Sequence, residues 1–491
     1  MFSRHKPAGP LTNTMKKRLT RLRLALFNAP LAAGLLIAAT LRAADIESAP
    51  GHTFNVADYG AMGNGSALDS AAINHAIEAC AKAGGGEVLV PAGRYLSGTI
   101  HLRSRVTLFL AAGATLVGTT NLAQYDQPAV PSYMPEARWG KWHRGLLVAQ
   151  DAEDVAIAGP GVIDGNKVFD PTGEEHMRGP HTLVFVNCRR FGVRDISIVD
   201  SANYAIFFQV SDDVDIRNVK ITGGWDGVHF RGAPERWCHN VNISGCRFYT
   251  GDDSIAGRYW DNVVIDDCTL NSACNGVRLI GPATHLLIND CLFYGPGQRP
   301  HRSSSRSNML SGIVLQPGAW DRTEGPLDDV LLAHNTMRGV ASPVTIWSRP
   351  GNPVGKITIT GLSAVGVYRS ALSVESWSDS PITNVVLRNT DLEFTGGGKA
   401  EPALQPVKRP GVDVRPLPAW GLYARNVEQL SVEDVRLSVA RDDFRPVIMA
   451  DGVQRLTLDN CKFTPVPGVA SPLVTTNVGK LIQRNTALPA P

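Results

Sequence analysis

Three aspartates are the residues with the clearest chemical potential in this sequence. Asp252 and Asp253 stand side by side in FYTGDDSIAG, and Asp226 lies 26 residues earlier, in GGWDGVHF. Hydrolysis of a glycosidic bond needs a protonated carboxyl group that donates to the leaving oxygen and an ionised carboxylate that activates water or attacks carbon. Carboxylates held close together repel one another, which raises the pKa of at least one and keeps a proton available. The three aspartates therefore form a candidate acid–base site.

A plain structural interpretation of these aspartates stands beside the catalytic one. An aspartate before a glycine is common in turns, and an aspartate pair can accept hydrogen bonds from backbone N–H groups. The chain has four further aspartate doublets, at 212–213, 266–267, 328–329 and 442–443. The doublet at 252–253 is favoured as catalytic because a glycine precedes it, a strand-forming SIA follows it and Asp226 lies about one repeat earlier. We expect the doublet in a turn, because neighbours within a strand point to opposite faces.

Four polar residues near the aspartates are candidates for binding a sugar substrate. Asn275 follows the doublet by about one repeat and can bind a sugar hydroxyl or orient a carboxylate, or simply form a turn before a glycine. His229 either faces outward beside the carboxylates or is a structural histidine whose hydrogen bonds are satisfied. Arg258 and Arg278 can bind an acidic group of the substrate, or form surface ion pairs.

Aromatic side chains offer platforms for the apolar faces of sugar rings. Trp347, in TIWSRPG, and Trp377, in SVESWSDS, lie about one repeat apart and are candidates for this role, although packing explains them equally well. Glu375 is the best carboxylate outside the aspartate cluster. It is the alternative acid if the site has moved along the fold.

A sequence repeat supplies the scaffold that can bring these residues together. The segments DVDIRNVKI, NVNISGCRF, NVVIDDCTL and HLLINDCLF alternate apolar and polar residues, and their first apolar residues are spaced by 27, 22 and 23 positions. Cys246, Cys268 and Cys291 recur in the same register. A period in the low twenties with short strands predicts a parallel β-helix, in which stacked coils share one core. The cysteines are then expected to be buried and stacked, without disulfides or bound metal.

The open end of such a stack must be covered. The segment DSAAINHAIEACAKAGGG has apolar residues at helical spacing, and Asp69 or Ser70 can serve as its N-cap. We therefore expect a short capping helix, followed by one β-helix domain from about 52 to 485 with long loops at 121–145, 295–310 and 398–418.

The N-terminus differs in charge from the remainder. The first 44 residues hold eight basic and no acidic side chains, which leaves 40 basic against 45 acidic groups in residues 45–491. The basic start precedes the apolar LALFNAPLAAGLLIAATLRAAD, a pattern typical of a secretory signal, with a membrane anchor as the alternative. The sequence thus predicts a secreted or periplasmic protein with no stable membrane association once residues 1–44 are removed. The mildly acidic body gives no reason to expect nucleic acid as a partner.

Several motifs resemble glycoside hydrolase family 28, the polygalacturonase family of the pectin-degrading β-helix enzymes. They are the N-terminal FNVADYGAMGNGSALDSAAINHAIEACAKAGGGEVLVPAGRYLSGTIHL, then GPGVIDG, GGWDGVHF and TGDDSIAG. The resemblance implies a right-handed, single-stranded parallel β-helix and inverting hydrolysis. It implies that Asp252 is the general acid and that Asp226 and Asp253 hold and deprotonate the attacking water.

The chain departs from the family pattern at three motifs. Only the aspartate of Asn-Thr-Asp is retained at 224–226, Cys-Asn-Gly stands at 274–276 where the family has Gly-His-Gly, and Val-Leu-Gln stands at 314–316 where it has Arg-Ile-Lys. In the family, the arginine and lysine of Arg-Ile-Lys bind the uronate carboxylate beside the scissile bond. Their loss favours a neutral or differently decorated sugar there, unless Arg258 or Arg278 replaces the charge.

The sequence therefore predicts an exported glycoside hydrolase that acts on a polysaccharide or oligosaccharide and needs no cofactor or metal. One alternative is a polysaccharide lyase or uronate epimerase on the same fold, with Arg258 or Arg278 as a base. Another is a non-catalytic carbohydrate-binding β-helix, which would gain little from three crowded carboxylates.

Overall fold

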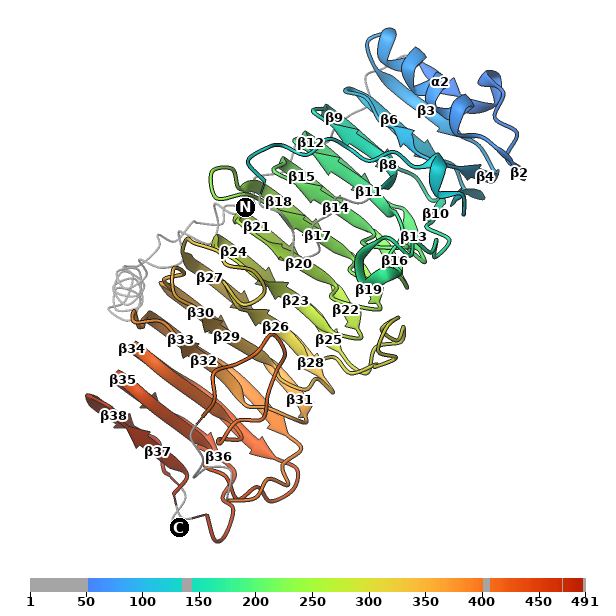
Figure 1. Ribbon diagram of the computed structural model, residues 1–491. Coiled ribbons are helices and arrows are strands. Elements are labelled where there is room, and N and C mark those ends of the chain that lie inside the picture. The colour runs from blue at the N-terminus through green and yellow to red at the C-terminus, as the bar shows by residue number, and fades with distance from the viewer. Residues whose placement is uncertain (1–51, 135–143, 401–406, 470, 489–491) are drawn as a thin grey trace, which may run out of the picture. The chain divides into compact units, whose positions relative to one another are not determined.

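The chain folds as a stack of short parallel strands. The computed structural model describes residues 52–134, 144–400, 407–469 and 471–488, and the predicted signal segment at 1–44 lies outside them. From β1 (Thr53–Asn55) to β38 (Lys480–Arg484), the strands join one parallel sheet that coils into a β-helix (Figure 1). The prediction of an all-β, right-handed parallel β-helix is confirmed. No helix in the described ranges is both long and apolar enough to cross a bilayer.

From β3 (Gly86–Val90) to β30 (Lys356–Thr360), each coil contributes three strands, so each strand pairs with the third strand after it. The column that carries the candidate site begins with β5 (Ile100–His101), β8 (Gly145–Gln150), β11 (His181–Val186), β14 (Ile206–Gln209), β17 (Val228–Arg231), β20 (Ile255–Arg258), β23 (Asn275–Leu279), β26 (Ser311–Leu315), β29 (Val344–Ser348) and β32 (Leu372–Ser376). It then joins the long β34 (Leu422–Val439) and β35 (Ile448–Asp459). We call the outward-facing side chains of β14 to β32 the site face.

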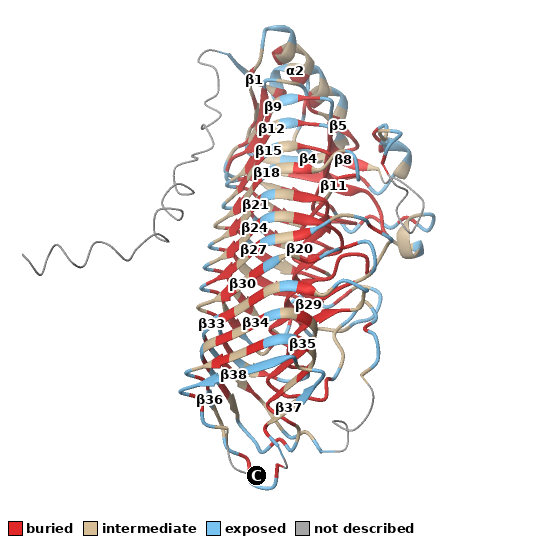
Figure 2. Ribbon diagram, turned by 90° about the vertical axis from the view of Figure 1, so that its left-hand side faces the viewer, coloured by how far each residue is buried: buried red, intermediate tan, exposed pale blue. Residues whose placement is uncertain are grey.

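Like residues stack over like through the core, as the repeat predicts. In β18 (Cys238–Ser244), β21 (Trp260–Asp266) and β24 (Ala283–Asn289), buried and half-exposed residues alternate in the same pattern. Val241 pairs in register with Val263, which in turn pairs with the leucine of the next coil. Figure 2 shows buried residues along the whole stack. Because each coil buries its apolar face against its neighbours, the core is continuous.

The predicted cysteine ladder lies inside this core. Cys246, Cys268 and Cys291 are at most 2% exposed. All eight cysteines of the chain fall within the described ranges, and each is buried and free. The interpretation of the ladder as small buried side chains is therefore confirmed. Aromatic residues stack in the same way, with the rings of Phe230 and Trp260 4.2 Å apart and nearly parallel.

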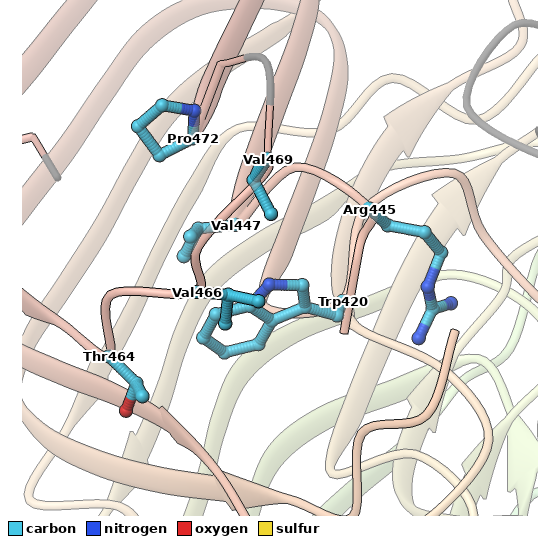
Figure 3. Close-up of a pocket in the computed structure, with 7 residues that line it drawn as sticks. All are labelled: Trp420, Arg445, Val447, Thr464, Val466, Val469 and Pro472. Atoms are coloured by element: carbon cyan, nitrogen blue, oxygen red, sulfur yellow. The ribbon is translucent and has the colours of Figure 1, made fainter. Parts of the chain in front are cut away.

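A helix covers the N-terminal end of the core, and a small pocket lies toward the C-terminal end. Helix α2 (Ser70–Lys82) covers the first coils and buries an apolar stripe that includes Ile73 and Ile77. Asp69 is its N-cap residue, but the carboxylate accepts hydrogen bonds from the backbone of the preceding loop, at Met62 and Gly63, rather than from the helix. At the other end, apolar side chains around Trp420 enclose a pocket of about 10 Å³ (Figure 3). That volume holds about one water molecule, so the pocket is a packing gap rather than a ligand site.

Three long connections border the site face. The first joins β10 (Val162–Asp164) to β11 and contains the short helix η3 (Glu174–His176). The second joins β25 (Leu292–Tyr294) to β26 and matches the loop expected at 295–310. The third joins β33 (Ile382–Phe394) to β34, and its segment 407–421 reaches back over earlier coils (Figure 1).

Candidate active site

The three predicted aspartates come together at the start of two neighbouring strands of the site face. Asp226 lies two residues before the start of β17, and the doublet occupies the turn before β20. The strand register aligns Val228 with Ile255, which sets Asp226 beside Asp253 one coil later. The backbone N–H of Asp253 donates to Asp226 Oδ1 at 3.2 Å. The doublet thus lies outside regular strand geometry, where both carboxylates can reach the same side.

The glycine before the doublet is required by close packing between coils. A Cβ atom at position 251 would collide with the carbonyl oxygen of Gly224 in the previous coil. A larger residue would therefore push the two turns apart and separate Asp226 from the doublet.

Asn275 and Arg278 hold Asp253 from the next coil. The backbone N–H and the side-chain amide of Asn275 both donate to Asp253 Oδ1, at 3.0 and 2.8 Å. Arg278 Nη1 lies 3.3 Å from Asp253 Oδ2. Asn275 therefore orients a carboxylate, one of the two roles considered for it, and Arg278 places a cation beside the cluster.

Asp252 is surrounded by cationic and donor groups from two of the bordering connections. Its Oδ2 lies 3.4 Å from Arg178 Nη2 and 3.6 Å from His301 Nε2, and its Oδ1 lies 3.9 Å from Arg306 Nη2. The Nδ1 atom of His301 accepts from the backbone N–H of Ser304 at 3.3 Å, so the ring proton sits on Nε2, toward Asp252. These contacts favour the ionised form of Asp252.

Sequence reasoning missed Arg178, His301 and Arg306. Arg178 is 74 residues from Asp252 and stacks over the Trp225 ring, with 3.6 Å between its guanidinium carbon and the ring centroid. The ring of His301 meets the same tryptophan edge-on at 5.2 Å. The only available signal was the assignment of 295–310 to a loop, because strand periodicity does not position residues in irregular connections.

His229 binds Asp226 through its Nδ1 atom. The distance from His229 Nδ1 to Asp226 Oδ2 is 2.6 Å, and Arg231 Nε donates to His229 Nε2 at 2.7 Å. Since an arginine N–H can only donate, His229 Nε2 is an acceptor and the ring proton lies on Nδ1, pointing at Asp226. Burial, followed by the positive charge of Arg231, lowers the pKa of His229 well below its ordinary value, so the ring is neutral. His229 is thus buried beside the carboxylates as a fixed hydrogen-bond donor.

The pKa values of the three aspartates are shifted in different directions. Burial, and then repulsion from Asp252 and Asp253, raises the pKa of Asp226 well above its ordinary value. Burial also raises the pKa of Asp253, although Arg278 opposes it. Burial would raise the pKa of Asp252 as well, but the nearby His301 ring and the charge of Arg178 hold it below its ordinary value. One ionised carboxylate therefore faces two groups that tend to keep protons, as acid–base chemistry requires.

The remaining predicted residues lie apart from the cluster. Arg258 is buried in β20, and its Nη1 pairs with Asp321 Oδ2 at 2.6 Å. Trp347 is buried in β29 at 2% exposure. Glu375, in β32, accepts from Arg415 Nη1 and Nη2 at 3.0 and 2.6 Å, and from Trp377 Nε1 at 2.8 Å. Glu375 is a neutralised structural group, so the structure does not support it as an alternative acid.

A metal ion fits this donor set poorly. One oxygen of Asp252, one of Asp253 and the Cys274 sulfur lie within 4.8 Å of one another. However, Arg306 Nη2 is 2.8 Å from the same sulfur, and Arg278 lies beside Asp253. A cation here would be repelled by two guanidinium groups.

Known proteins resemble this chain in the same region. A family described as "Rhamnogalacturonase A/epimerase, pectate lyase-like" matches residues 53–278. An exo-poly-alpha-D-galacturonosidase of Dickeya chrysanthemi is 38% identical over 254 residues, which cover 41% of each protein. In this region the chain resembles glycoside hydrolase family 28, with divergent motifs. The matched segments span less than half the length of the first curated relatives.

Solved structures agree on the fold. An exopolygalacturonase from Thermotoga maritima superposes with a TM-score of 0.60 at 21% identity, covering 80% of this chain and 93% of its own. The family 28 exopolygalacturonase of Yersinia enterocolitica gives 0.56 at 18% identity, covering 90% and 79%. At these identities the likeness concerns the β-helix alone.

Proposed function

We propose that the protein is an exported glycoside hydrolase that cleaves glycosidic bonds of a pectin-type polysaccharide or oligosaccharide by inverting acid–base catalysis. The observation that carries the proposal is the gathering of Asp226, Asp252 and Asp253 on one face of neighbouring coils, with Arg178 beside Asp252 and Arg278 beside Asp253. The polygalacturonase names of the relatives support the substrate class.

The cluster also suggests which carboxyl group carries the proton. Among the described residues, the donors at hydrogen-bond distance from Asp226 are neutral, namely the His229 ring and the Asp253 backbone, whereas cations lie beside the other two aspartates. We expect Asp226 to be the general acid and Asp252 the ionised base, with Asp253 holding the water. This differs from the roles implied by the family resemblance, in which Asp252 is the acid.

A leaving group that needs no protonation separates the two assignments. General acid catalysis contributes roughly 10²–10⁴-fold to a rate. Asp226→Asn should therefore lose about 10³-fold on pectin oligosaccharides but much less on a dinitrophenyl glycoside of the same sugar, whereas Asp252→Asn should lose activity on both. Selective recovery of Asp252→Asn on the dinitrophenyl glycoside would instead support the assignment implied by the resemblance.

The reaction class itself is tested by product analysis on the wild-type protein. A panel of pectic polysaccharides is incubated with the protein, and reducing ends and ultraviolet absorbance are read together. New reducing ends without absorbance, with inversion at the anomeric carbon by NMR, support the proposal. An unsaturated, absorbing product would identify a lyase, and binding without new ends a carbohydrate-binding protein.

The charges around the cluster disfavour a lyase or epimerase mechanism that uses arginine as base. Although burial alone would lower the pKa of Arg278, the charge of Asp253 keeps it above its ordinary value, and Glu174 does the same for Arg178. A guanidinium held protonated in this way cannot remove a sugar proton. Arg258, which was also considered as the base, is engaged with Asp321.

Export rests on the basic and apolar character of residues 1–44. Expression of the full chain in a secreting host, followed by mass spectrometry of the mature N-terminus, tests it. Cleavage near residue 44 and recovery outside the cytoplasm are expected; an uncleaved, membrane-associated chain would indicate an anchor.

A further inference from the structure

A cavity lies near the aspartate cluster. It is a cavity of about 360 Å³, lined by the segment 318–324 that follows β26, the turn 349–351 after β29, and Arg409 from the third connection. Its volume lies within the range of about 300–1,000 Å³ that is usual for small-molecule sites.

One arginine lies between the cavity and the aspartate cluster. Arg278 lies 3.3 Å from Asp253 through Nη1, and its guanidinium carbon lies 5.2 Å from the ring centroid of Trp320. Trp320 lines the cavity. A lining residue of the cavity therefore lies one arginine side chain away from Asp253.

The acidic groups of the cavity wall are already engaged. Asp321 Oδ2 lies 2.6 Å from Arg258 Nη1, and Glu324 Oε1 lies 2.7 Å from Arg322 Nη2. Each wall carboxylate is thus matched by an arginine and leaves no charge to balance a further cation.

Two further arginines line the cavity without such a match. Within the described ranges, neither Arg349 nor Arg409 forms an ion pair with a carboxylate. Arg349 packs over the Trp347 ring at 5.3 Å, and its Nε atom is buried without a hydrogen-bond partner. Burial and repulsion from Arg409 lower the pKa of Arg349. An anion bound between the two guanidinium groups would relieve this repulsion.

We propose that this cavity is a substrate subsite in which Arg349 and Arg409 bind the carboxylate of a uronic acid residue adjoining the cleaved bond. The proposal rests on the proposed hydrolase function and extends it to an acidic sugar chain. Arginine suits this role because its planar fork of N–H groups matches a carboxylate. The charge of the missing Arg-Ile-Lys motif would then be supplied by different residues, farther along the site face.

Equilibrium binding to the catalytically impaired Asp252→Asn protein tests the subsite without turnover. The probes are trigalacturonate and its fully methyl-esterified form. Arg349→Gln/Arg409→Gln in this background should weaken trigalacturonate binding at least tenfold, about 1.4 kcal/mol, and binding of the ester less than twofold. Arg338→Gln, at an exposed position of β28 (Thr336–Arg338) outside the cavity lining, is the matched control and should change neither. Trigalacturonate affinity of the parent should also fall as salt rises.

Equal weakening of both probes, or no weakening of either, would overturn the subsite. Because Arg349 packs on Trp347, the exposed Arg409→Gln change alone provides a variant that leaves this packing intact, with a loss of about threefold or more expected for trigalacturonate only. If the Asp252→Asn parent binds acid and ester equally while the wild-type protein hydrolyses pectic chains, the subsite is rejected and the proposed function stands. Selective binding of trigalacturonate without any hydrolysis would support the subsite and reject the hydrolase.

Discussion

The site face carries buried carboxylates in two contrasting places, the aspartate cluster and Glu375. In the aspartate cluster, three carboxylates share one turn region, and the closest side-chain partner of Asp226 is a neutral histidine. Several coils later, Glu375 is completely buried, yet both of its oxygens are paired with Arg415 and one also accepts from Trp377. Burial alone therefore does not mark a catalytic carboxylate; the balance of charge around it does.

The two environments have different consequences for the fold. The Glu375–Arg415 pair ties the third connection to the sheet, so it contributes to structure. The aspartate cluster contains like charges in close contact, which costs stability and keeps a proton available. This cost is tolerable in a β-helix because the shared core of many coils supplies the stability elsewhere.

The strongest test of the comparison exchanges one carboxylate for its amide at each site. Asp252→Asn should lower kcat/KM on the cleaved polysaccharide by about 10³-fold or more, because it removes a reacting group. Glu375→Gln should leave the turnover of folded protein within about tenfold, since its carboxylate is already neutralised. Initial rates on equal amounts of folded protein provide the measurement. Comparable losses in both variants would contradict the distinction.

Stability should respond in the opposite order. Glu375→Gln leaves Arg415 without its ion partner in a largely buried position, which should destabilise the protein by about 2–4 kcal/mol. Urea denaturation followed by circular dichroism measures this, and proteolysis at 407–418 reports whether the connection detaches. Glu393→Gln, in the same region but without an ion pair in the described ranges, is the control, and it should stay within about 0.5 kcal/mol of wild type.

Removing the least compensated carboxylate should stabilise the fold. The folded pKa of Asp226 lies above its ordinary value of 3.8, so at pH 7 ionisation favours the unfolded chain. Asp226→Asn should then gain about 1–2 kcal/mol near pH 7 while losing activity. The gain should shrink as pH falls through the raised pKa and vanish below about 3.8. Thermal unfolding between pH 4 and 7 measures it; a destabilised variant at pH 7 would count against the raised pKa of Asp226.

The smallest expected effect concerns His301. Its Nε2–H helps to keep the pKa of Asp252 low, so His301→Gln should raise that pKa and move the acidic limb of the kcat/KM profile upward by about half a pH unit or more. His334→Gln, at an exposed position, should leave the profile unchanged. A loss of kcat/KM in His301→Gln without any movement of the limb would indicate a purely structural role.

More of the fold than of the site could be predicted from the sequence. Val241, Val263 and Leu286 head repeats whose alternation specifies strands, and the structure stacks them in register. The same spacing correctly placed Asp226, the doublet and Asn275 on neighbouring coils. It could not indicate that Glu375 meets Arg415, 40 residues later, because that contact depends on the path of an irregular connection.

The sequence by itself determined the coil, the buried ladders and the column of aspartates, because periodic alternation acts locally and repeats in every coil. Only the tertiary structure decided which carboxylate is ionised. Arg178, His301 and Arg306 reach Asp252 from two long connections that have no periodicity, and Arg409, on a third such connection, lines the same cavity as Arg349. Charge acts through space rather than along the chain, so the chemistry of the site depends on contacts that the repeat does not encode.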